Sequence, residues 1–280
     1  MPTKSNNEDT DMESESSDSD EDDKEEGGGT ETPVLQVRKV SHEGGVNRIR
    51  AMPQYPYICA LCADTDLVQV WDFSSHLHAL GEADTAANNG GSNVFNQAPL
   101  SKFAGHKDEG YAIDWSLVVP GRLVSGDCKN HIHLWEPASE STWNVDSTPF
   151  VGHTASVEDL QWSPTEPYIF ASCSINEIIT IWDTRTGKSP AVSIKAHKAY
   201  PDELYASISP HEASTLAVSS TDNQLTIWDL SLERDEEEEA EFRAKTKEQV
   251  NAPNDFPPQL LFVHQDQKDL KELYVTAALF

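Results

Sequence analysis

A histidine that is followed about thirty residues later by a tryptophan and an acid recurs four times in this 280-residue chain. The pairs, in chain order, are His42 with Trp71, His106 with Trp135, His153 with Trp182, and His197 with Trp228. The separation is 29 residues in the first three pairs and 31 in the fourth. A fixed period that links Gly-His to Trp-Asp is typical of propeller blades. The spacing therefore predicts stacked repeats, because one blade cannot bury both of its faces alone.

Each repeat contains three short apolar or alternating runs that are separated by polar turns, which is typical of strands. In the second and third repeats the runs are 111–116, 123–126, 132–135, 158–164, 170–173 and 179–182. The stretch after each tryptophan, such as 148–151, can supply a fourth strand. We therefore predict an all-β fold of the β-propeller class.

The recurrent histidines and tryptophans have a structural interpretation. In such a blade the histidine, a serine of the second strand and the tryptophan form a buried hydrogen-bonded chain, because a buried indole N–H needs a partner. Ser125 and Ser172 lie ten residues before a tryptophan, as this role requires, whereas the usual turn aspartate occurs only as Asp222. We expect incomplete networks and blades of modest stability. The expected structural residues are His106, Ser125, Trp135, His153, Ser172, Trp182, His197 and Trp228.

Chain length limits the number of blades. A blade of this type needs about 40–45 residues, and a propeller has four to eight blades. We assign 1–32 to a disordered acidic tail and 33–280 to the propeller. The repeats lie near 34–73, 99–137, 148–184 and 192–230, with a partial repeat at 259–280 and insertions at 74–98 and 231–257. We expect an incomplete propeller of about four to five blades, a shortened form of a larger one.

The net charge of −28 is concentrated in two acidic tracts. Residues 1–32 hold thirteen acids and almost no apolar side chain, so this tail should be disordered. The second tract contains Asp235, Glu236, Glu237, Glu238 and Glu239. Such tracts either maintain solubility or attract basic proteins, and we favour partner binding because clustered acids steer cationic partners. Like-charge repulsion disfavours nucleic acid and anionic membranes as direct partners.

Three serines of the tail are phosphorylation candidates, because each is followed three residues later by an acid: Ser5, Ser17 and Ser19. Phosphorylation would add about −1.5 to −2 charges per site. The four cysteines form no second pair beyond Cys59 and Cys62, so we expect buried free thiols and no metal or cofactor. Neither a nucleophile elbow, a phosphate-binding loop nor a zinc-protease motif occurs. We expect a soluble intracellular protein that is not an enzyme.

Four stretches closely resemble the glutamate-rich WD-repeat proteins: 46–52, 105–115, 123–128 and 152–166. The resemblance extends from about Thr32 to Leu273. It implies a WD-repeat propeller, a role in assembling the large ribosomal subunit by chaperoning a basic ribosomal protein, histone binding, and location in the nucleus and nucleolus. Members of that family usually carry an amino-terminal helix and an extra first blade, which are not found between Met1 and the acidic tract.

Three local features supply further candidate partner sites. The run that begins Phe256, Pro257, Pro258 resembles the double-proline loop of histone-binding proteins of chromatin assembly, although an ordinary connector explains it equally well. The sequence Trp-Asp-Thr-Arg ending at Arg185 matches a pattern by which some WD-repeat proteins dock on a cullin ubiquitin-ligase adaptor. Glu109, Tyr111 and Glu158 would form an acidic, aromatic rim for a basic peptide, or only a solvated edge.

The sequence thus favours a non-catalytic scaffold that chaperones basic clients in large-subunit biogenesis. A histone chaperone and a ubiquitin-ligase substrate adaptor remain as alternatives. The first two share one mechanism, and the sequence alone does not choose the client.

Overall fold

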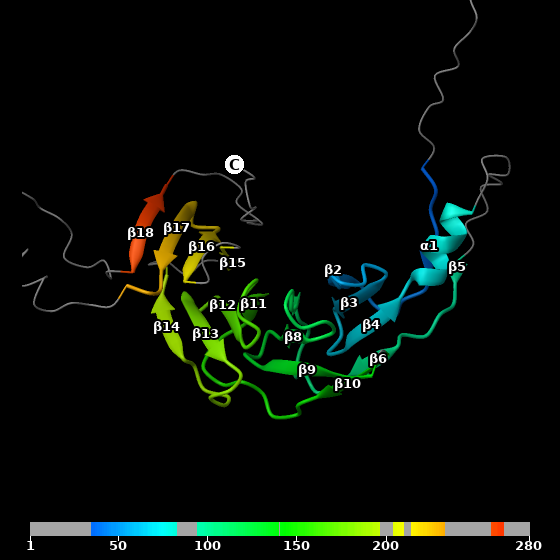
Figure 1. Cartoon of the computed structure of the whole chain (residues 1–280), viewed down its shortest axis with the longest axis horizontal. Coiled ribbons are helices and arrows are strands. Elements are labelled where there is room, and N and C mark those ends of the chain that lie inside the picture. The colour runs from blue at the N-terminus through cyan, green and yellow to red at the C-terminus, as the bar shows by residue number, and fades with distance from the viewer. Residues whose placement is uncertain are drawn as a thin grey trace, which may run out of the picture. The chain divides into compact units, whose positions relative to one another are not determined.

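The computed structural model describes residues 35–82, 94–139, 141–196, 204–209, 214–232 and 259–265. The chain divides into two units, Met1–Gln36 and Val37–Phe280, and every described strand and helix belongs to the second unit. This unit contains four four-stranded antiparallel sheets, which confirms the predicted all-β propeller class (Figure 1).

We number the sheets as blades 1 to 4 in chain order. Blade 1 comprises β2 (Val46–Ala51), β3 (Ile58–Ala63), β4 (Val68–Asp72) and β6 (Ser101–Phe103). Blade 2 comprises β7 (Ala112–Trp115), β8 (Leu123–Gly126), β9 (Ile132–Ser139) and β10 (Thr142–Val145). Blade 3 comprises β11 (Val157–Trp162), β12 (Ile169–Ser174), β13 (Ile178–Asp183) and β14 (Val192–Lys195). Blade 4 comprises β15 (Leu204–Ile208), β16 (Thr215–Ser220), β17 (Gln224–Asp229) and β18 (Leu260–His264).

Two small elements accompany blade 1. The helix α1 (Ser74–Gly81) follows β4 directly, within the stretch 74–98 that the sequence analysis treated as a polar insertion. A short parallel pair joins β1 (Lys39–Val40) to β5 (Val94–Phe95). Both elements lie beside blade 1 and have no counterpart among the described residues of the other blades.

The turn between the second and third strands contains a residue in the left-handed region in blades 2, 3 and 4. A residue with positive φ stands there each time: Asn130 at 65°, Glu177 at 68° and Asn223 at 65°. Asparagine tolerates the left-handed region, which makes two of these turns easy to form. Glutamate adopts positive φ less readily than asparagine does. The buried carboxylate of Glu177 forms an ion pair with Lys195, with Nζ and Oε2 2.7 Å apart.

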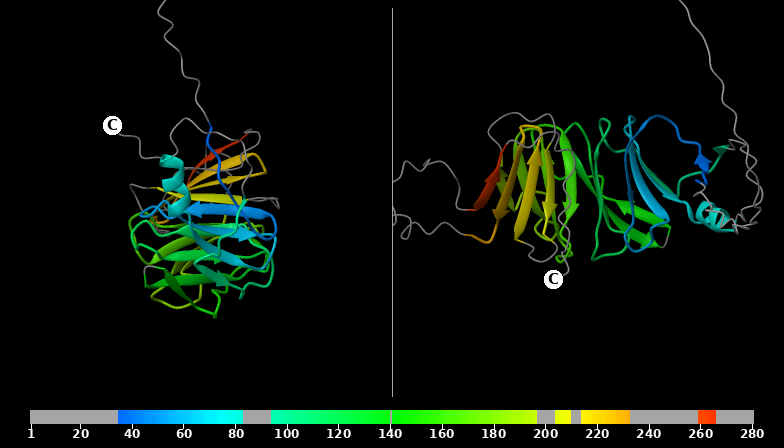
Figure 2. Two further views of the ribbon diagram at one scale, coloured as in Figure 1. Left: turned by 90° about the vertical axis from the view of Figure 1, so that its right-hand side faces the viewer. Right: turned by 90° about the horizontal axis from the view of Figure 1, so that it is seen from above.

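Blades 2, 3 and 4 each pack against the blade before them (Figure 2). A tryptophan lies in each of these contacts. Trp135 and Trp115 of blade 2 pack on aliphatic side chains of blade 1. Trp182 and Trp162 of blade 3 meet blade 2, and Trp228 of blade 4 meets blade 3. These side chains are at most 2% exposed, so burial between neighbouring blades supplies the core that a single sheet lacks.

Two predicted outer strands differ from the structure. The segment near 259, expected to open a fifth repeat, forms β18 and pairs with β17, so it completes blade 4. In blade 2 the outer strand is Thr142–Val145 rather than 148–151, and Phe150 makes only an isolated bridge to Ile132. Both errors arise because an outer strand is half exposed and carries a weak apolar pattern.

Candidate functional site

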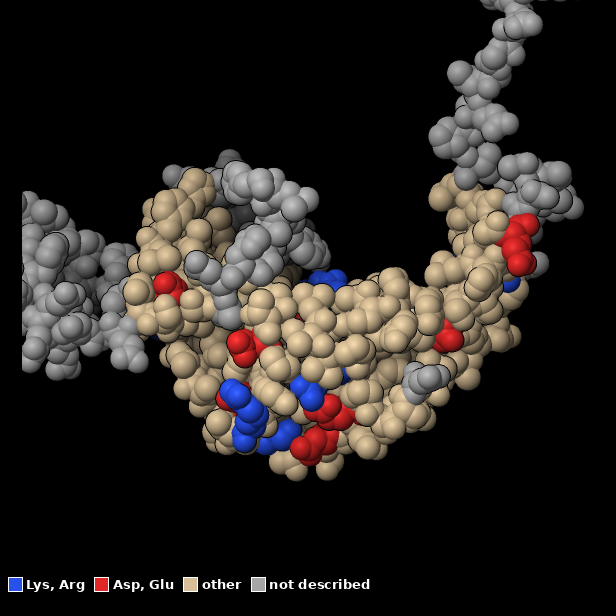
Figure 3. Space-filling view, in the orientation of Figure 1, with Lys and Arg blue, Asp and Glu red and all other residues tan. Residues whose placement is uncertain are grey.

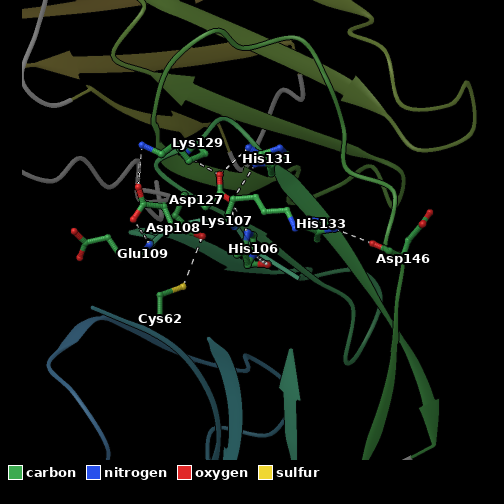
Figure 4. A network of polar contacts seen from close by, with 12 residues as sticks. Cys62, His106, Lys107, Asp108, Glu109, Asp127, Lys129, His131, His133 and Asp146 are labelled. Atoms are coloured by element: carbon green, nitrogen blue, oxygen red, sulfur yellow. Dashed lines mark hydrogen bonds and ion pairs between the residues drawn. The ribbon is translucent and has the colours of Figure 1, made fainter. Parts of the chain in front are cut away.

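The hydrogen-bonded network of blade 2 is the most complete of the four (Figure 4). The hydroxyl of Ser125 lies 2.8 Å from His106 Nε2, and it accepts a hydrogen bond from Trp135 Nε1 at 2.9 Å. His106 Nδ1 lies 3.3 Å from the Asp127 carboxylate, and all four side chains are at most 3% exposed. The carboxylate accepts only, so His106 donates a hydrogen bond from Nδ1 and accepts one at Nε2 from the Ser125 hydroxyl.

Asp127 organises the adjoining loop, and the sequence analysis missed it. Its carboxylate accepts backbone N–H groups of Lys107, Lys129 and His131 at 2.8 to 2.9 Å. Burial alone would raise its pKa, but hydrogen bonds from His106 and from these amides hold the pKa well below its usual range. Asp127 stands eight residues before Trp135 rather than the expected six, so the fixed spacing did not reveal it.

Blade 3 contains the same serine-centred contact. His153 Nε2 lies 2.6 Å from Ser172 Oγ, and Trp182 Nε1 donates to that oxygen at 2.7 Å. Burial lowers the pKa of His153 to about 4, against a smaller opposite effect of Asn176. His153 is therefore neutral at neutral pH and serves to hold the blade together.

Blades 4 and 1 depart from this pattern. In blade 4 the indole Nε1 of Trp228 donates to Thr226 Oγ1 at 2.8 Å, and His197 lies outside the described residues. In blade 1 Leu61 stands where the serine would be, since it pairs with Ile49 as Ser125 pairs with Ile113. Within the described chain, Trp71 Nε1 and His42 Nε2 are consequently buried without a hydrogen-bond partner.

The described residues contain no group of three His, Cys, Asp or Glu side chains arranged to hold a metal. The four cysteines are free thiols, and burial raises their pKa values, that of Cys62 to about 12. These thiols are therefore protonated at neutral pH and are poor nucleophiles. No helix in the described part of the chain is long and apolar enough to span a membrane.

A cluster of carboxylates lies where the loops of blades 2 and 3 meet. We call Asp108, Glu109, Tyr111 and Glu158 the acidic rim. Glu109 Oε2 accepts hydrogen bonds from Asn47 Nδ2 at 3.0 Å and from the Tyr111 hydroxyl at 3.3 Å. Partial burial and the charge of Glu109 raise the pKa of Tyr111, and Glu158 adds to the effect. The rim therefore has a negative electrostatic potential, to which Glu109 and Glu158 both contribute.

Lys129 provides a basic contact to the rim, with Nζ 3.2 Å from Asp108 Oδ2. Elsewhere the charges are more evenly mixed: on the face in Figure 3, lysines and arginines lie beside acids. The described residues hold 18 acids and 11 bases, whereas the whole chain holds 48 and 20. Most of the negative charge therefore belongs to sequence outside the described part.

Behind the rim, a buried ion pair connects blade 1 to blade 3. Arg48 Nη1 lies 2.7 Å from Asp159 Oδ1, and both side chains are no more than 13% exposed. Burial raises the pKa of the neighbouring Asp114 to about 7 and also raises that of Asp159, which Arg48 opposes. This ion pair holds inner strands together, so its carboxylate is not available to a client.

Arg185 lies on an exposed turn after β13. Its guanidinium Nη2 is 2.7 Å from Asp183 Oδ2, its Nε is 2.9 Å from Oδ1, and its backbone N–H donates to the same Oδ1 at 2.9 Å. The guanidinium also lies 5.2 Å from the centre of the Tyr168 ring. The side chain is 58% exposed, so the turn presents an oriented cationic group to solvent.

Other candidates fall outside the described residues. These are Asp235, Glu236, Glu237, Glu238, Glu239, Phe256, Pro257, Pro258, Ser5, Ser17 and Ser19. The structure thus brings together Glu109, Tyr111 and Glu158, and it places Arg185 separately, after β13 of blade 3.

Comparison with known proteins gives three kinds of match. The family WD40, described as WD domain, G-beta repeat, matches residues 145–183. The chain is 57% identical over 290 residues to Protein HEAT STRESS TOLERANT DWD 1 of Arabidopsis thaliana, covering 88% of this chain and 62% of the relative. It is 46% identical over 163 residues to Glutamate-rich WD repeat-containing protein 1 of Dictyostelium discoideum, covering 58% of this chain and 32% of the relative.

A third protein, Ribosome assembly protein rrb1 of Schizosaccharomyces pombe, is 31% identical over 303 residues, covering 87% of this chain and 60% of the relative. A chain in the crystal structure of the mitotic checkpoint complex matches with a TM-score of 0.50 and 19% identity, covering 66% of this chain and 48% of that one. At this identity the likeness shows the fold alone. The chain spans no more than 62% of the length of the curated relatives named above.

Proposed function

The chain belongs to the glutamate-rich WD-repeat family, and from that premise we propose that it is a non-catalytic scaffold that chaperones basic proteins during assembly of the large ribosomal subunit. The proposed site is the acidic rim together with the acidic tract 235–239. On this proposal the protein works in the nucleus and nucleolus. Histones are the second class of client that the same chemistry admits.

The observation that carries the proposal is the convergence of three carboxylates in the rim. Burial and Ser156 act in opposite directions on the pKa of Cys128, and Glu158, Glu109 and Asp108 all raise it, so their fields meet at one point. Lysine and arginine side chains of a client would complement this field, and Tyr111 offers a ring for cation–π contact. Clustered charge of this kind speeds the capture of a cationic partner more than it strengthens a single contact.

Affinity isolation from cell extract, followed by mass spectrometry, tests the proposal. The wild-type chain should capture a basic ribosomal protein at about 50 mM salt and lose most of it at about 500 mM, because the Debye length shortens severalfold. A Glu109→Gln/Glu158→Gln double variant should capture several-fold less. Exposed glutamates away from the rim, changed in Glu43→Gln/Glu82→Gln, provide the matched control.

Recovery of histones in place of a ribosomal protein would select the second client class. Capture that is equal for both double variants, or insensitive to salt, would contradict electrostatic binding by the rim.

A ubiquitin-ligase adaptor function is the second candidate, because Arg185 is exposed, oriented by Asp183 and part of the Trp-Asp-Thr-Arg sequence. The Arabidopsis relative carries DWD in its name, which adds support. In this function the turn after β13 would bind the cullin-ligase adaptor while the rim holds the substrate. Co-purification of the adaptor in the same experiment, lost in an Arg185→Ser variant, would support it.

A further inference from the structure

The loop between β7 and β8 of blade 2 is apolar where a polar turn is expected. Four consecutive apolar residues follow Ser116, and we call them the apolar loop: Leu117, Val118, Val119 and Pro120. Leu117 is 53% exposed and Val118 is 40% exposed. A run of exposed apolar side chains is unfavourable in water, so its presence on a loop indicates a function.

The hairpin does not need these side chains in order to form. In blades 2 and 3 the last residue of the first strand pairs with the residue eight positions on. In both loops the hydroxyl of the first serine accepts the backbone N–H three residues on, at 3.0 Å. Thr165 and Glu166 stand in blade 3 where Val118 and Val119 stand in blade 2. A polar loop therefore closes the same hairpin, and the apolar residues serve another purpose.

The apolar loop is held in place from three sides. Gln54 of blade 1 donates from Nε2 to two carbonyl oxygens at the start of the loop, at 3.0 and 2.8 Å. Trp143 Nε1 of the outer strand donates to the Gly121 carbonyl at 2.6 Å. Arg122 Nη1 donates to the Pro167 carbonyl of blade 3 at 2.7 Å. Because the loop is fixed in advance, a partner that binds it loses little affinity to ordering it.

The apolar loop continues into the turn that carries Arg185. Arg122 follows the loop, and its guanidinium lies 5.5 Å from the centre of the Tyr168 ring. The guanidinium of Arg185 lies 5.2 Å from the centre of the same ring, and Tyr168 is 40% exposed. The apolar loop, Tyr168 and Arg185 therefore form one surface across blades 2 and 3, which we call the loop surface.

The loop surface combines an apolar part with a cationic end. Asp183 orients Arg185 through Nε and Nη2, so Nη1 keeps donors that no described residue accepts. A carboxylate of a partner complements these donors, and an apolar hollow complements the loop. A single exposed guanidinium contributes little affinity, so most of the affinity must come from the apolar part.

The loop surface and the acidic rim lie at opposite ends of β7. Tyr111 of the rim directly precedes this strand, and Leu117 lies just beyond its end. A strand rises about 3.3 Å per residue, so its four residues separate the two sites by about 13 Å. A partner on the loop surface therefore leaves the rim open to a basic client.

We propose that the apolar loop is the second half of the docking surface for the cullin-ligase adaptor, an inference that rests on the adaptor function proposed for Arg185. Leu117 and Val118 enter an apolar hollow of the adaptor, and Arg185 pairs with a carboxylate beside that hollow. The Trp-Asp-Thr-Arg sequence supplies the charge, and the loop on the preceding blade supplies affinity and specificity.

Biolayer interferometry with the full chain and the purified adaptor tests the proposal. A Leu117→Asn/Val118→Thr variant should bind at least about tenfold more weakly, because it removes apolar contacts without changing the charge. The loss should be the same at about 50 and 500 mM salt, since screening acts on charges. The thermal midpoint should equal that of the wild type, because blade 3 closes the same hairpin with polar residues.

The matched control makes the same changes ahead of β1. Leu35 and Val37 are 86% and 61% exposed, more than the two loop residues. A Leu35→Asn/Val37→Thr variant should therefore bind like the wild type if the loss is specific to the loop. Equal losses in the two double variants would overturn the proposal.

Two further outcomes separate this inference from the function on which it rests. If Arg185→Ser abolishes binding while the loop variant binds like the wild type, the inference is overturned and the adaptor function stands. If the wild-type chain does not bind the adaptor, both are overturned. Light scattering provides a last test. A dimer that the loop variant converts to a monomer would assign the loop to a second copy of the chain and overturn the inference.

Discussion

Blades 1 and 3 share a histidine-to-tryptophan spacing of 29 residues but end in different physical states. In blade 3 Ser172 joins His153 to Trp182, and the face is covered by blade 2. In blade 1 Leu61 replaces the serine, Trp71 Nε1 has no partner among the described residues, and the face lines a pocket. The period therefore specifies the strands, whereas one residue of the second strand decides whether the polar network closes within the blade.

Lowering the pH should destabilise blade 3, and this is the largest effect that we expect. Burial lowers the pKa of His153 from 6.5 to about 4, so the folded state binds fewer protons than the unfolded state between these values. The contribution of His153 to the free energy of unfolding should be fully present above about pH 6.5 and fall by up to about 3 kcal/mol as pH drops to 4, whereas Asp114, whose pKa burial raises to about 7, acts in the opposite direction over the same range. Urea unfolding at pH 7, 5.5 and 4.5 measures this loss.

A His153→Gln variant should lose less stability than the wild type between pH 7 and 4.5, even if it is less stable throughout. The pH dependence that remains is the sum of His133, whose pKa burial also lowers to about 4, and of Asp114 and Asp159, whose raised pKa values act in the opposite direction. Equal slopes for wild type and variant would show that His153 is not neutral and buried in the folded chain.

Removing the serine hydroxyl should make blade 3 resemble blade 1, with the next largest effect. Ser172→Ala leaves His153 Nε2 and Trp182 Nε1 buried without their partner, which should cost about 1–3 kcal/mol. Ser219→Ala is the matched control, because Ser219 is also fully buried on a second strand and its hydroxyl has no partner in the described chain. Urea midpoints should fall for the first variant and change little for the second.

If Ser172→Ala and Ser219→Ala cost the same, the serine-centred network would contribute nothing beyond packing. The difference between the two faces would then depend on the covering blade alone.

Residues that repeat along the chain could be predicted, and residues that occur once could not. The spacing of His153, Ser172 and Trp182 identified the strands and the atoms that now lie within 3 Å of one another. Asp127 was not predicted because it lies outside the repeated spacing, although it accepts hydrogen bonds from three backbone amides. The outer strand Leu260–His264 was assigned to a new repeat because residues 231–257 separate it from its hairpin in sequence.

The pocket on blade 1 depends on tertiary structure in a way that local patterns do not report. The helix α1 is short and holds two histidines and two serines, so its sequence did not predict that Leu77 and Leu80 would border an apolar face. A leucine is ordinary in an apolar strand, so Leu61 alone predicts nothing unusual. Its effect on the network is recognised only by comparison with Ser125 and Ser172, which hold the equivalent position in blades 2 and 3. Tyr111 and Glu158 each follow a repeated histidine by five residues and Glu109 follows one by three, and this spacing led us to expect the three residues on one rim.

Replacing Trp71 or Trp182 by phenylalanine should have a smaller effect, which again distinguishes blade 1 from blade 3. Trp182→Phe removes an indole N–H that donates a hydrogen bond to Ser172. Trp71→Phe removes an indole N–H that has no partner among the described residues. The first should cost about 1 kcal/mol more in the free energy of unfolding than the second, the usual net contribution of one hydrogen bond. Circular dichroism during urea unfolding measures both. Equal costs would indicate that Trp71 Nε1 has an acceptor in the folded protein.

The segment after the third strand should show the smallest effect on stability, because the same aspartate-to-backbone hydrogen bond occurs in three blades. Asp183 accepts the backbone N–H of Arg185 at 2.9 Å, Asp72 that of Ser74 at 2.8 Å, and Asp229 that of Ser231 at 2.9 Å. Arg185→Ser therefore gives blade 3 the side chain that blades 1 and 4 already carry. The thermal midpoint should not change, whereas capture of the cullin-ligase adaptor should be lost. A fall in the midpoint comparable to that of Ser172→Ala would make Arg185 a structural residue, and adaptor capture that survives the substitution would contradict its role as the docking group.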